Sequence, residues 1–423
     1  MVERRVPIPV HEAVEQVVAF AKERAMEWVP LEEADGRFLA QPLVADHNVP
    51  PFDKSPLDGF AIRAVDTEDA TRETPVRLKI IEEIGAGQVA QKVPSQGEAI
   101  RIMTGAQMPE GTDAVVMFEL TKEISEAGES FIEVKRSFQP GDNISFCGED
   151  AKEGTPLVEK GRQIDAGIKA LLATFGYAKV PVYKMPKIGI FATGTELLEV
   201  DEPLVPGKIR NSNAYTVASQ VKQIGAEPVY LGKLVDDFDQ CYDAIATALA
   251  DVDVLVTTGG VSVGDYDYLP AIYEKLGANV LFNKIAMRPG SVTTVAEREG
   301  QLLFGLSGNP SACFVGFELL VRPFIHVGFC SEQPFLKRVK ATLGRDFPKP
   351  NPFTRFVRSQ VEFKIDRLIV KPTGLDKSGV VTSLANANGL LMLPGGTRGF
   401  QAGDEVDVLL LKGEGGPMPL SEA

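Results

Sequence analysis

The feature that most constrains the fold lies between residues 187 and 326, where short apolar runs alternate with segments of helical pattern. The strand-like runs are 188–192, 229–232 and 252–256, and the predicted helices are 212–224, 237–250 and 267–276. Runs of this length and composition are typical of strands buried on both faces. Strands that alternate with helices indicate a parallel sheet with right-handed crossovers. In such a sheet, ligands bind in the crevice at the carboxyl ends of the strands.

The chain on either side of this segment has a different pattern. The first third combines a predicted helix at 11–27 with a Pro-rich stretch at 48–60 and short β-like runs, which indicates a small β-rich domain. A further helix is predicted at 162–176. From about residue 335 the pattern is β again, which predicts a compact barrel or sandwich, and the residues from 413 onward are expected to fray.

The charge of the chain excludes some classes of protein. It has 44 Lys and Arg against 58 Asp and Glu, a formal charge of −14. A sequence-independent nucleic-acid binder needs a basic footprint, so this class is not expected. No uninterrupted run of about 18 apolar residues occurs, so no membrane-spanning segment is expected. The first residues have no apolar core of signal-peptide length.

Cysteine and histidine usage narrows the chemistry further. Cys147, Cys241, Cys313 and Cys330 are far apart and form no C-x-x-C pair, a pattern typical of a reduced, cytosolic (cytoplasmic) chain. The 3 histidines are scattered, which argues against a His-rich metal centre. Catalysis would therefore depend on carboxylates, Lys, Arg, hydroxyls and backbone amides. A bound cation would be hard and oxygen-ligated, such as Mg²⁺.

Two loops that follow strands carry candidate binding residues. In the first, Thr193, Gly194 and Thr195 offer hydroxyls and amides to an anion, and Glu196 could hold a metal or a hydroxyl. An ordinary strand-to-helix turn is the alternative. The second loop contains Gly259, Gly260, Val261, Ser262, Asp265 and Asp267. Its glycines permit close backbone approach to a phosphate or a pterin-like ring, and carboxylates beside a phosphate site imply a bridging cation. Alternatively, both aspartates cap the next helix.

Two further loops carry cations and amides. Lys284 and Arg288, with the turn at Pro289 and Gly290, could bind an oxyanion, although solvated surface charge is the alternative. The fourth loop contains Ser307, Gly308, Asn309, Pro310 and Ser311, and the free amides of a helix that begins near Pro310 would form another anion site. Four anion-friendly loops in one α/β segment predict a phosphorylated ligand with several charged groups.

Seven motifs occur in the order of a known family. They are Pro50–Ala61 (Pro-Pro-Phe-Asp-Lys-Ser-Pro-Leu-Asp-Gly-Phe-Ala), Arg101–Ala106, Gly148–Asp150, Thr193–Glu196, Gly259–Asp267, Met287–Gly290 and Gly308–Pro310. Over nearly its whole length the chain resembles the molybdopterin molybdenumtransferase family, the MoeA and gephyrin E-domain type of molybdenum cofactor enzyme.

The resemblance implies a multidomain α/β and β fold. The implied parts are an elongated N-terminal mixed α/β domain (1–47 with 147–183), an inserted β-rich domain (48–146), a molybdopterin-binding α/β domain with a mostly parallel, MogA-like sheet (184–331) and a C-terminal β-barrel (332–413). By this resemblance, the protein is expected to be an elongated homodimer whose active cleft is shared between the two subunits.

The resemblance also implies an activity. The enzyme takes adenylylated molybdopterin and molybdate, hydrolyses the adenylate with Mg²⁺, releases AMP and leaves molybdenum on the dithiolene sulfurs. A molybdopterin adenylyltransferase is a possible partner that supplies the substrate. By resemblance, Glu196, Asp236 and Asp267 are acidic positions of the cleft and candidate metal ligands. Asp58, Thr104 and Asp150 match family positions that the partner subunit contributes to the cleft. Lys284 matches a family lysine near the oxyanion.

The chain departs from the family at a few positions. Arg288 stands where many members have Lys, Ser307 replaces a frequent Pro, Ala312 takes the place of a serine, and Ser145 stands where some members carry Arg. These departures leave the shape of the oxyanion site open. Two alternative functions are a molybdopterin adenylyltransferase, which would need only about 140–180 residues, and a non-catalytic scaffold like gephyrin, which uses a long linker and a second enzymatic domain.

Overall fold

The structure is a computed structural model of the chain that describes residues 6–235, 237–260, 269–413 and 415–416. It divides into two compact units. Unit 1 comprises Met1–Gln41, Lys160–Ala170 and Ala178–Ala423, and unit 2 comprises Pro42–Glu159 and Leu171–Tyr177. Each unit has its own apolar cores, so the two are described separately.

A six-stranded sheet forms the centre of unit 1. Its strand order is β14 (Glu227–Leu234), β11 (Lys187–Thr193), β15 (Val254–Thr258), β19 (Gln301–Leu306), β18 (Thr294–Arg298) and β16 (Asn279–Phe282). The first four strands are parallel, whereas β18 and β16 pair antiparallel at one edge. The predicted mostly parallel sheet is therefore confirmed, with an antiparallel edge that the sequence pattern did not indicate.

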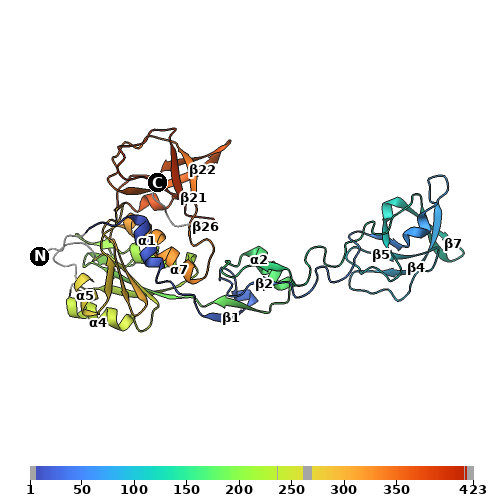
Figure 1. Cartoon of the computed structure of the whole chain (residues 1–423), viewed down its shortest axis with the longest axis horizontal. Coiled ribbons are helices and arrows are strands. Elements are labelled where there is room, and N and C mark those ends of the chain that lie inside the picture. The colour runs from blue at the N-terminus through green and yellow to red at the C-terminus, as the bar shows by residue number, and fades with distance from the viewer. Residues whose placement is uncertain (1–5, 236, 261–268, 414, 417–423) are drawn as a thin grey trace. The chain divides into compact units, whose positions relative to one another are not determined.

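Helices cover both faces of this sheet because its strands are apolar on both sides. On one face Ile190, Val256 and Phe304 pack with the helices α1 (Val10–Val18), α3 (Asn213–Gln223), α6 (Pro310–Gly316) and α7 (Arg322–Gly328). On the other face Leu255 and Leu303 pack with α4 (Phe238–Ala248) and α5 (Leu269–Lys275). Figure 1 shows α4 and α5 together, on the side of the sheet away from α1 and α7.

One helical stretch among the described residues is long and apolar enough to cross a membrane by length and composition alone. It is Pro310–Gly328, with a mean hydropathy of 1.3, and it joins α6, the π-helical η4 (Phe317–Val321) and α7. Its most apolar window is 78% buried inside the protein. A helix that is apolar all round is typical of a protein core, and this one lies in the core beneath the sheet.

The C-terminal part of unit 1 is a barrel. Its strands are β22 (Thr354–Lys364), β23 (Arg367–Pro372), β21 (Arg338–Leu343), β25 (Glu405–Leu410) and β24 (Gly389–Leu393), and β24 pairs with β22 to close the ring. The short β17 (Met287–Arg288) joins the outside of β22 in parallel. The predicted barrel is confirmed over the sandwich alternative. Strand β17 directly follows the loop that contains Lys284. Its pairing with β22 therefore joins the α/β part to the barrel.

The remaining elements of unit 1 are short. Strand β1 (Met26–Pro30) pairs antiparallel with β10 (Lys179–Tyr183), and β20 (Phe335–Leu336) pairs with β26 (Gly415–Gly416). The other elements are β12 (Leu197–Leu198), β13 (Ile209–Arg210), η1 (Leu31–Glu33) and η5 (Thr382–Leu384). The helix predicted at 11–27 was too long: α1 ends at Val18, and pairing with β10 places Met26 and Glu27 in a strand although both are good helix formers.

Unit 2 is built around a second six-stranded sheet. Its order is β6 (Ala114–Met117), β3 (Gly59–Ile62), β5 (Glu98–Ile102), β4 (Val76–Ile84), β8 (Glu129–Val134) and β7 (Thr121–Glu126). Phe60, Leu78, Val116 and Ile132 form its core. The unit also contains β2 (Leu43–Val44), β9 (Pro156–Val158), η2 (Ala64–Thr67) and η3 (Phe118–Leu120), while α2 (Ala166–Thr174) contributes to both units. The β-rich character predicted for this region is confirmed.

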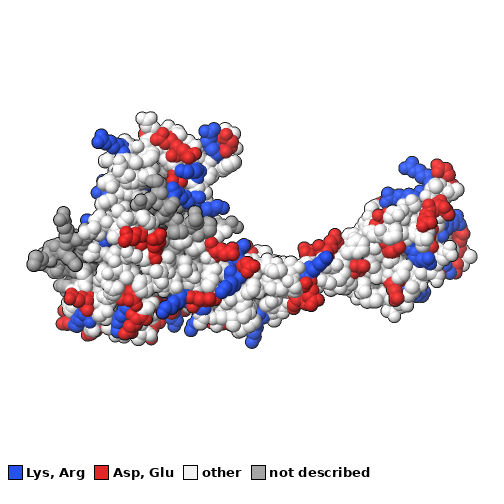
Figure 2. Space-filling model, viewed as in Figure 1, with Lys and Arg blue, Asp and Glu red and all other residues white. Residues whose placement is uncertain are grey.

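Acidic and basic side chains are interspersed on the surface of each unit. Figure 2 shows Lys and Arg alternating with Asp and Glu on the face that it draws.

Candidate functional site

The carboxyl ends of three neighbouring parallel strands open into one cavity in unit 1. Strands β11, β15 and β19 end at Thr193, Thr258 and Leu306, and the loops that follow them line a cavity of about 990 Å³. The wall residues that the sequence predicted are Thr193, Gly194, Thr195, Glu196, Gly259, Gly260, Arg288, Pro289, Gly290, Ser307, Gly308, Asn309 and Pro310. The structure therefore brings together described residues from all four predicted loops.

Glycines allow two of these loops to pack against each other. A Cβ on Gly259 would lie 2.5 Å from Thr193 Oγ1, and the φ of Gly259 is +96°. A Cβ on Gly194, at φ +134°, would lie 2.3 Å from Glu196 Oε2. Thr193 Oγ1 also donates a hydrogen bond to the carbonyl of Thr258 at 3.2 Å. Only glycine suits both positions, so the floor of the cavity is backbone held in one arrangement.

The start of α6 differs from what the sequence predicted. Ser311 N donates to the carbonyl of Ser378, and the amides of Ala312 and Cys313 donate to the carbonyl of Asn309. Pro310 has no amide hydrogen to donate. The amides of the three residues after it are therefore the described donors at this helix start, and all three are already bonded. The expectation of a free-amide anion site at this helix start is therefore wrong. Carbonyl oxygens of the protein accept the hydrogen bonds that these amides would otherwise donate to an anion.

Ser311 also lies away from the cavity wall. Its side chain is fully buried, and its hydroxyl donates to the carbonyl of Val380 at 2.6 Å. Ser307 Oγ accepts a hydrogen bond from Asn309 N at 3.3 Å, which shapes the turn before the helix. Asn213 Nδ2 donates to the carbonyl of Gly308 at 2.8 Å and fixes the same turn from α3.

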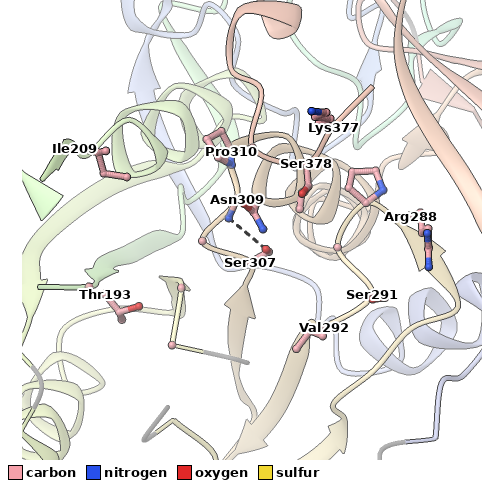
Figure 3. Close-up of a pocket in the computed structure, with 18 of the residues that line it drawn as sticks. Thr193, Ile209, Arg288, Ser291, Val292, Ser307, Asn309, Pro310, Lys377 and Ser378 are labelled. Atoms are coloured by element: carbon pink, nitrogen blue, oxygen red, sulfur yellow. Dashed lines mark hydrogen bonds between the residues drawn. The ribbon is translucent and has the colours of Figure 1, made fainter. Parts of the chain in front are cut away.

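The cavity has one wall that sequence reasoning missed. The barrel contributes Arg355, Asp376, Lys377, Ser378 and Gly379, and the α/β part adds Ile209, Ser291, Val292 and Ala312. Figure 3 shows Lys377 and Ser378 on a segment beside the Ser307–Pro310 turn. The only sequence signal at the barrel segment is a cluster of turn-forming residues after a strand, and an ordinary loop has the same cluster.

Some charged side chains of the cavity wall form ion pairs with other described residues, and others do not. Asp376 accepts from Arg355 Nη1 at 2.9 Å and from Lys349 Nζ at 3.2 Å. By contrast, Arg288, Lys377 and Glu196 make no ion pair with any residue that the structure describes. Arg288 is exposed at the end of β17. The wall thus presents two cations and one carboxylate that are available to a ligand.

Three family models together match most of the chain. The MoeA N-terminal region (domain I and II) matches residues 8–176, a probable molybdopterin binding domain matches 189–327, and the MoeA C-terminal region (domain IV) matches 340–411. The chain is 59% identical to a molybdopterin molybdenumtransferase of Bacillus subtilis, over 98% of this chain and 97% of that protein. The chain belongs to the MoeA family.

Other relatives agree with this assignment. A molybdopterin molybdenumtransferase of Staphylococcus aureus is 47% identical and covers 98% of both chains. A crystal structure of a molybdopterin biosynthesis MoeA protein from Pyrococcus horikoshii has a TM-score of 0.81 at 32% identity, covering 96% of this chain and 100% of that one. The fold of this MoeA-family chain is therefore similar over 96% of its length to that of a solved relative.

Three predicted site residues of this MoeA-family member belong to unit 2. Asp58 directly precedes β3 and Thr104 follows β5, and the two strands are antiparallel neighbours that place Gly59 opposite Ile102. Thr104 therefore reaches Asp58, and its amide and hydroxyl both donate to Asp58 Oδ1. These hydrogen bonds, chiefly that from the amide, hold the pKa of the Asp58 carboxyl below its ordinary value.

Asp150 and Ser145 lie in the segment that follows the β-rich sheet. Asp150 is exposed, and its amide donates to the carbonyl of Val49 at 2.9 Å. Ser145 donates through its hydroxyl to Glu149 Oε2 at 2.8 Å. Here the position thus holds a local turn together, and a neutral hydroxyl occupies it.

One further predicted site residue does not line the cavity, and several others lie outside the described residues. Lys284 does not line the cavity, although its carbonyl accepts from Ile8 N at 3.1 Å and fixes the loop before β17. Asp236, Val261, Ser262, Asp265 and Asp267 lie outside the described residues. Among the residues that are described, no group of three or more His, Cys, Asp or Glu could hold a metal ion. Of the predicted metal ligands, only Glu196 is described.

Proposed function

We propose that the chain inserts molybdenum into the molybdenum cofactor: it takes adenylylated molybdopterin and molybdate, releases AMP and yields molybdenum-molybdopterin. The observation that carries this proposal is the cavity at the ends of β11, β15 and β19, lined by glycine-rich loops and by two cations without an ion-pair partner among the described residues. Such a site suits a large anionic ligand with a flat ring. It occurs in a chain that is 59% identical to a named molybdopterin molybdenumtransferase over 98% of its length.

The described residues divide the work of binding. The backbone of Gly259 and Gly260 offers a flat surface against which a pterin ring can lie. Arg288 offers a forked guanidinium to a tetrahedral oxyanion, whether phosphate or molybdate. We assign Lys284 to the same oxyanion once the substrate is bound, by family resemblance. In this scheme water attacks the phosphorus on the molybdopterin side of the phosphoanhydride, the bond from that phosphorus to the bridging oxygen breaks, and AMP leaves with the bridging oxygen.

A magnesium ion is part of the proposal. Glu196 lines the cavity and pairs with no described cation, so its oxygens suit a hard divalent cation. Glu196, Asp236 and Asp267 would hold it, and the bound ion would neutralise charge on the phosphoryl oxygens. Asp58, Thr104 and Asp150 complete the proposed catalytic set from the partner subunit of a homodimer.

Assembly, location and domain limits are further parts of the proposal. We place the protein in the cytoplasm, as its four scattered cysteines suggest, and expect a molybdopterin adenylyltransferase to supply its substrate. The proposed domains are 1–47 with 147–183, 48–146, 184–331 and 332–413. The gaps between the matched family regions, near 177–188 and 328–339, support the last two limits.

A reconstitution tests the activity. Purified protein is mixed with adenylylated molybdopterin, Mg²⁺ and molybdate, and AMP release is followed together with activation of an apo-molybdoenzyme. Release that depends on molybdate and stops with EDTA supports the proposal. Tight pterin binding without AMP release under these conditions contradicts it and favours a carrier role, after tungstate has been tried in place of molybdate.

Sedimentation tests the shared cleft. A homodimer is expected at micromolar concentration in analytical ultracentrifugation. A monomer at that concentration would rule out a cleft to which Asp58 and Asp150 contribute from a second subunit. In that case the reconstitution above would still decide the reaction itself.

A further inference from the structure

A loop of the barrel, residues 373–381 between β23 and η5, reaches into the wall of the α/β cavity. Lys377, Ser378 and Gly379 of this barrel loop line the cavity together with Arg288 and the Ser307–Pro310 turn. Figure 3 shows Lys377 and Ser378 beside Asn309 and Pro310, on the opposite side of the turn from Thr193. The cavity is therefore closed by residues that lie about 70 positions beyond the Ser307–Pro310 turn in the chain.

A buried arginine holds the barrel loop from within the barrel. Arg358, on β22, is 1% exposed. Its Nη2 donates to the carbonyls of Leu375 and Lys377 at 3.2 and 3.1 Å, and its Nη1 donates to Asp376 Oδ1 at 3.5 Å. One guanidinium thus joins three consecutive residues of the loop, as its fork of donors allows. Arg355 holds the other carboxylate oxygen of Asp376 at 2.9 Å.

The α/β part holds the same loop from the opposite side. Ser311 N donates to the carbonyl of Ser378 at 2.9 Å, and Ser311 Oγ donates to the carbonyl of Val380 at 2.6 Å. Lys377 lies between these two anchored stretches. Its backbone is therefore fixed, although its own side chain is exposed. Pre-organisation of this kind lowers the entropy lost when a ligand is bound.

The charges at the wall give this lysine a role. Arg355 pairs with Asp376, which also contacts two other cations, whereas Lys377 pairs with no residue in the described part of the chain. Arg288 is likewise unpaired among those residues. An unpaired lysine on a fixed backbone, at the rim of a cavity with a second unpaired cation, is suited to a multiply charged anion.

We infer that Lys377 binds a tetrahedral oxyanion of the substrates and that Arg358 is the positioning residue that presents it. The inference rests on the proposed function for the identity of the oxyanion, which is either molybdate or the phosphoryl group of the adenylate. Lys377 binds the anion opposite Arg288, so the anion lies between the α/β part and the barrel loop.

Steady-state kinetics of Lys377 variants test the binding role. Lys377→Met is expected to raise a KM about 10- to 100-fold with little change in kcat, because a charge-assisted hydrogen bond contributes about 1.5–3 kcal/mol. A rise in the KM for molybdate assigns that ion, and a rise in the KM for adenylylated molybdopterin assigns its phosphoryl group. Lys377→Arg, which keeps the charge, is expected to restore most of the affinity. The matched control is Lys364→Met at the exposed hairpin tip of the same barrel.

A second pair of variants tests the positioning role. Arg358→Lys keeps the buried charge but cannot join the carbonyls of Leu375 and Lys377 together. It is expected to raise the same KM as Lys377→Met while the variant still melts cooperatively. Arg358→Met is also informative if it folds. Unchanged KM values for both substrates in folded Lys377→Met would overturn the inference, and unchanged values in Arg358→Lys would remove Arg358 from it.

Binding without turnover separates this inference from the proposed function. Calorimetric titrations of the wild type and Lys377→Met with molybdate alone, and with AMP alone, need no reaction. If the wild type fails the reconstitution but Lys377→Met loses binding of one anion, the proposed reaction fails and Lys377 keeps its role. If the wild type inserts molybdenum and Lys377→Met binds and reacts normally, only the inference is overturned.

Discussion

Thr104 donates two hydrogen bonds to one oxygen of Asp58, from its amide at 2.7 Å and from its hydroxyl at 2.8 Å. Both residues are exposed at the ends of neighbouring strands of unit 2. The arrangement keeps the Asp58 carboxyl ionised, since hydrogen bonds to the charged form lower the pKa of an acid. An acidic group that stays charged and exposed is what a shared catalytic cleft would require.

Thr104→Val should raise the pKa of Asp58 only part of the way to its ordinary value of 3.8, because the hydrogen bond from the backbone amide of residue 104 remains. A lowered pKa means that Asp58 stabilises the fold above its ordinary pKa and that this contribution is lost as the pH falls through the folded value. NMR titration of the Asp58 carboxyl carbon measures the shift directly. Thr71→Val, at an exposed Thr–Thr contact in the same unit, is the control. An unchanged Asp58 titration in Thr104→Val would show that the hydroxyl has no influence.

Lys284→Ala and Asp267→Asn should each fold normally but lose molybdenum insertion by roughly 100-fold or more, the usual effect of removing an electrostatic group from a reacting centre. Thermal melting checks the fold, and molybdate-dependent AMP release checks the activity. Lys222→Ala, in the last turn of α3, is the matched lysine control. Full activity in Lys284→Ala would contradict the assignment of this lysine to the oxyanion.

Gly259→Ala should impair substrate binding and lower the free energy of unfolding by about 1–3 kcal/mol, because the new Cβ would collide with Thr193 at a φ that L-residues rarely adopt. Gly232→Ala is a matched control, since Gly232 has φ +95° but no atom within 4 Å of its Cβ position. Urea denaturation and pterin binding are measured for both. Equal losses of stability in the two variants would mean that backbone strain alone is responsible and that close packing of the loops is not.

His326 should make the fold less stable in mild acid. Its Nε2 is buried and has no partner among the described residues, and burial, reinforced by nearby Arg322, lowers its pKa to about 3. The unfolded chain takes up the proton near pH 6.5, so the contribution to stability is lost between pH 6.5 and about 3.

Urea denaturation of wild type and His326→Leu between pH 7 and pH 4 tests this expectation. The variant should lose roughly 3 kcal/mol less than the wild type over that range, since each pH unit between the two pKa values is worth about 1.4 kcal/mol. His47→Gln, at a half-exposed histidine, is the control. Parallel losses in all three proteins would contradict a buried neutral His326.

The sequence determined much of the site because its loops follow strands. Thr193–Glu196, Gly259–Gly260 and Ser307–Pro310 each come directly after a buried apolar run, and parallel strands end at one edge of a sheet. Local pattern therefore placed these loops together before any contact was known. The same local reasoning failed at Met26 and Glu27, two good helix formers that are held in a strand by pairing with β10.

Only the tertiary structure decided which donors and charges remain free. The amides at the start of α6 look available in the sequence, but the carbonyl of Ser378 and that of Asn309 occupy them. Lys377 looks like an ordinary loop lysine, but Arg358 and Ser311 fix its loop at the cavity. The physical reason is that a hydrogen bond is satisfied by whichever group lies within about 3 Å. Closure of the barrel brings that group from a distant part of the chain, where periodicity and motif spacing carry no information.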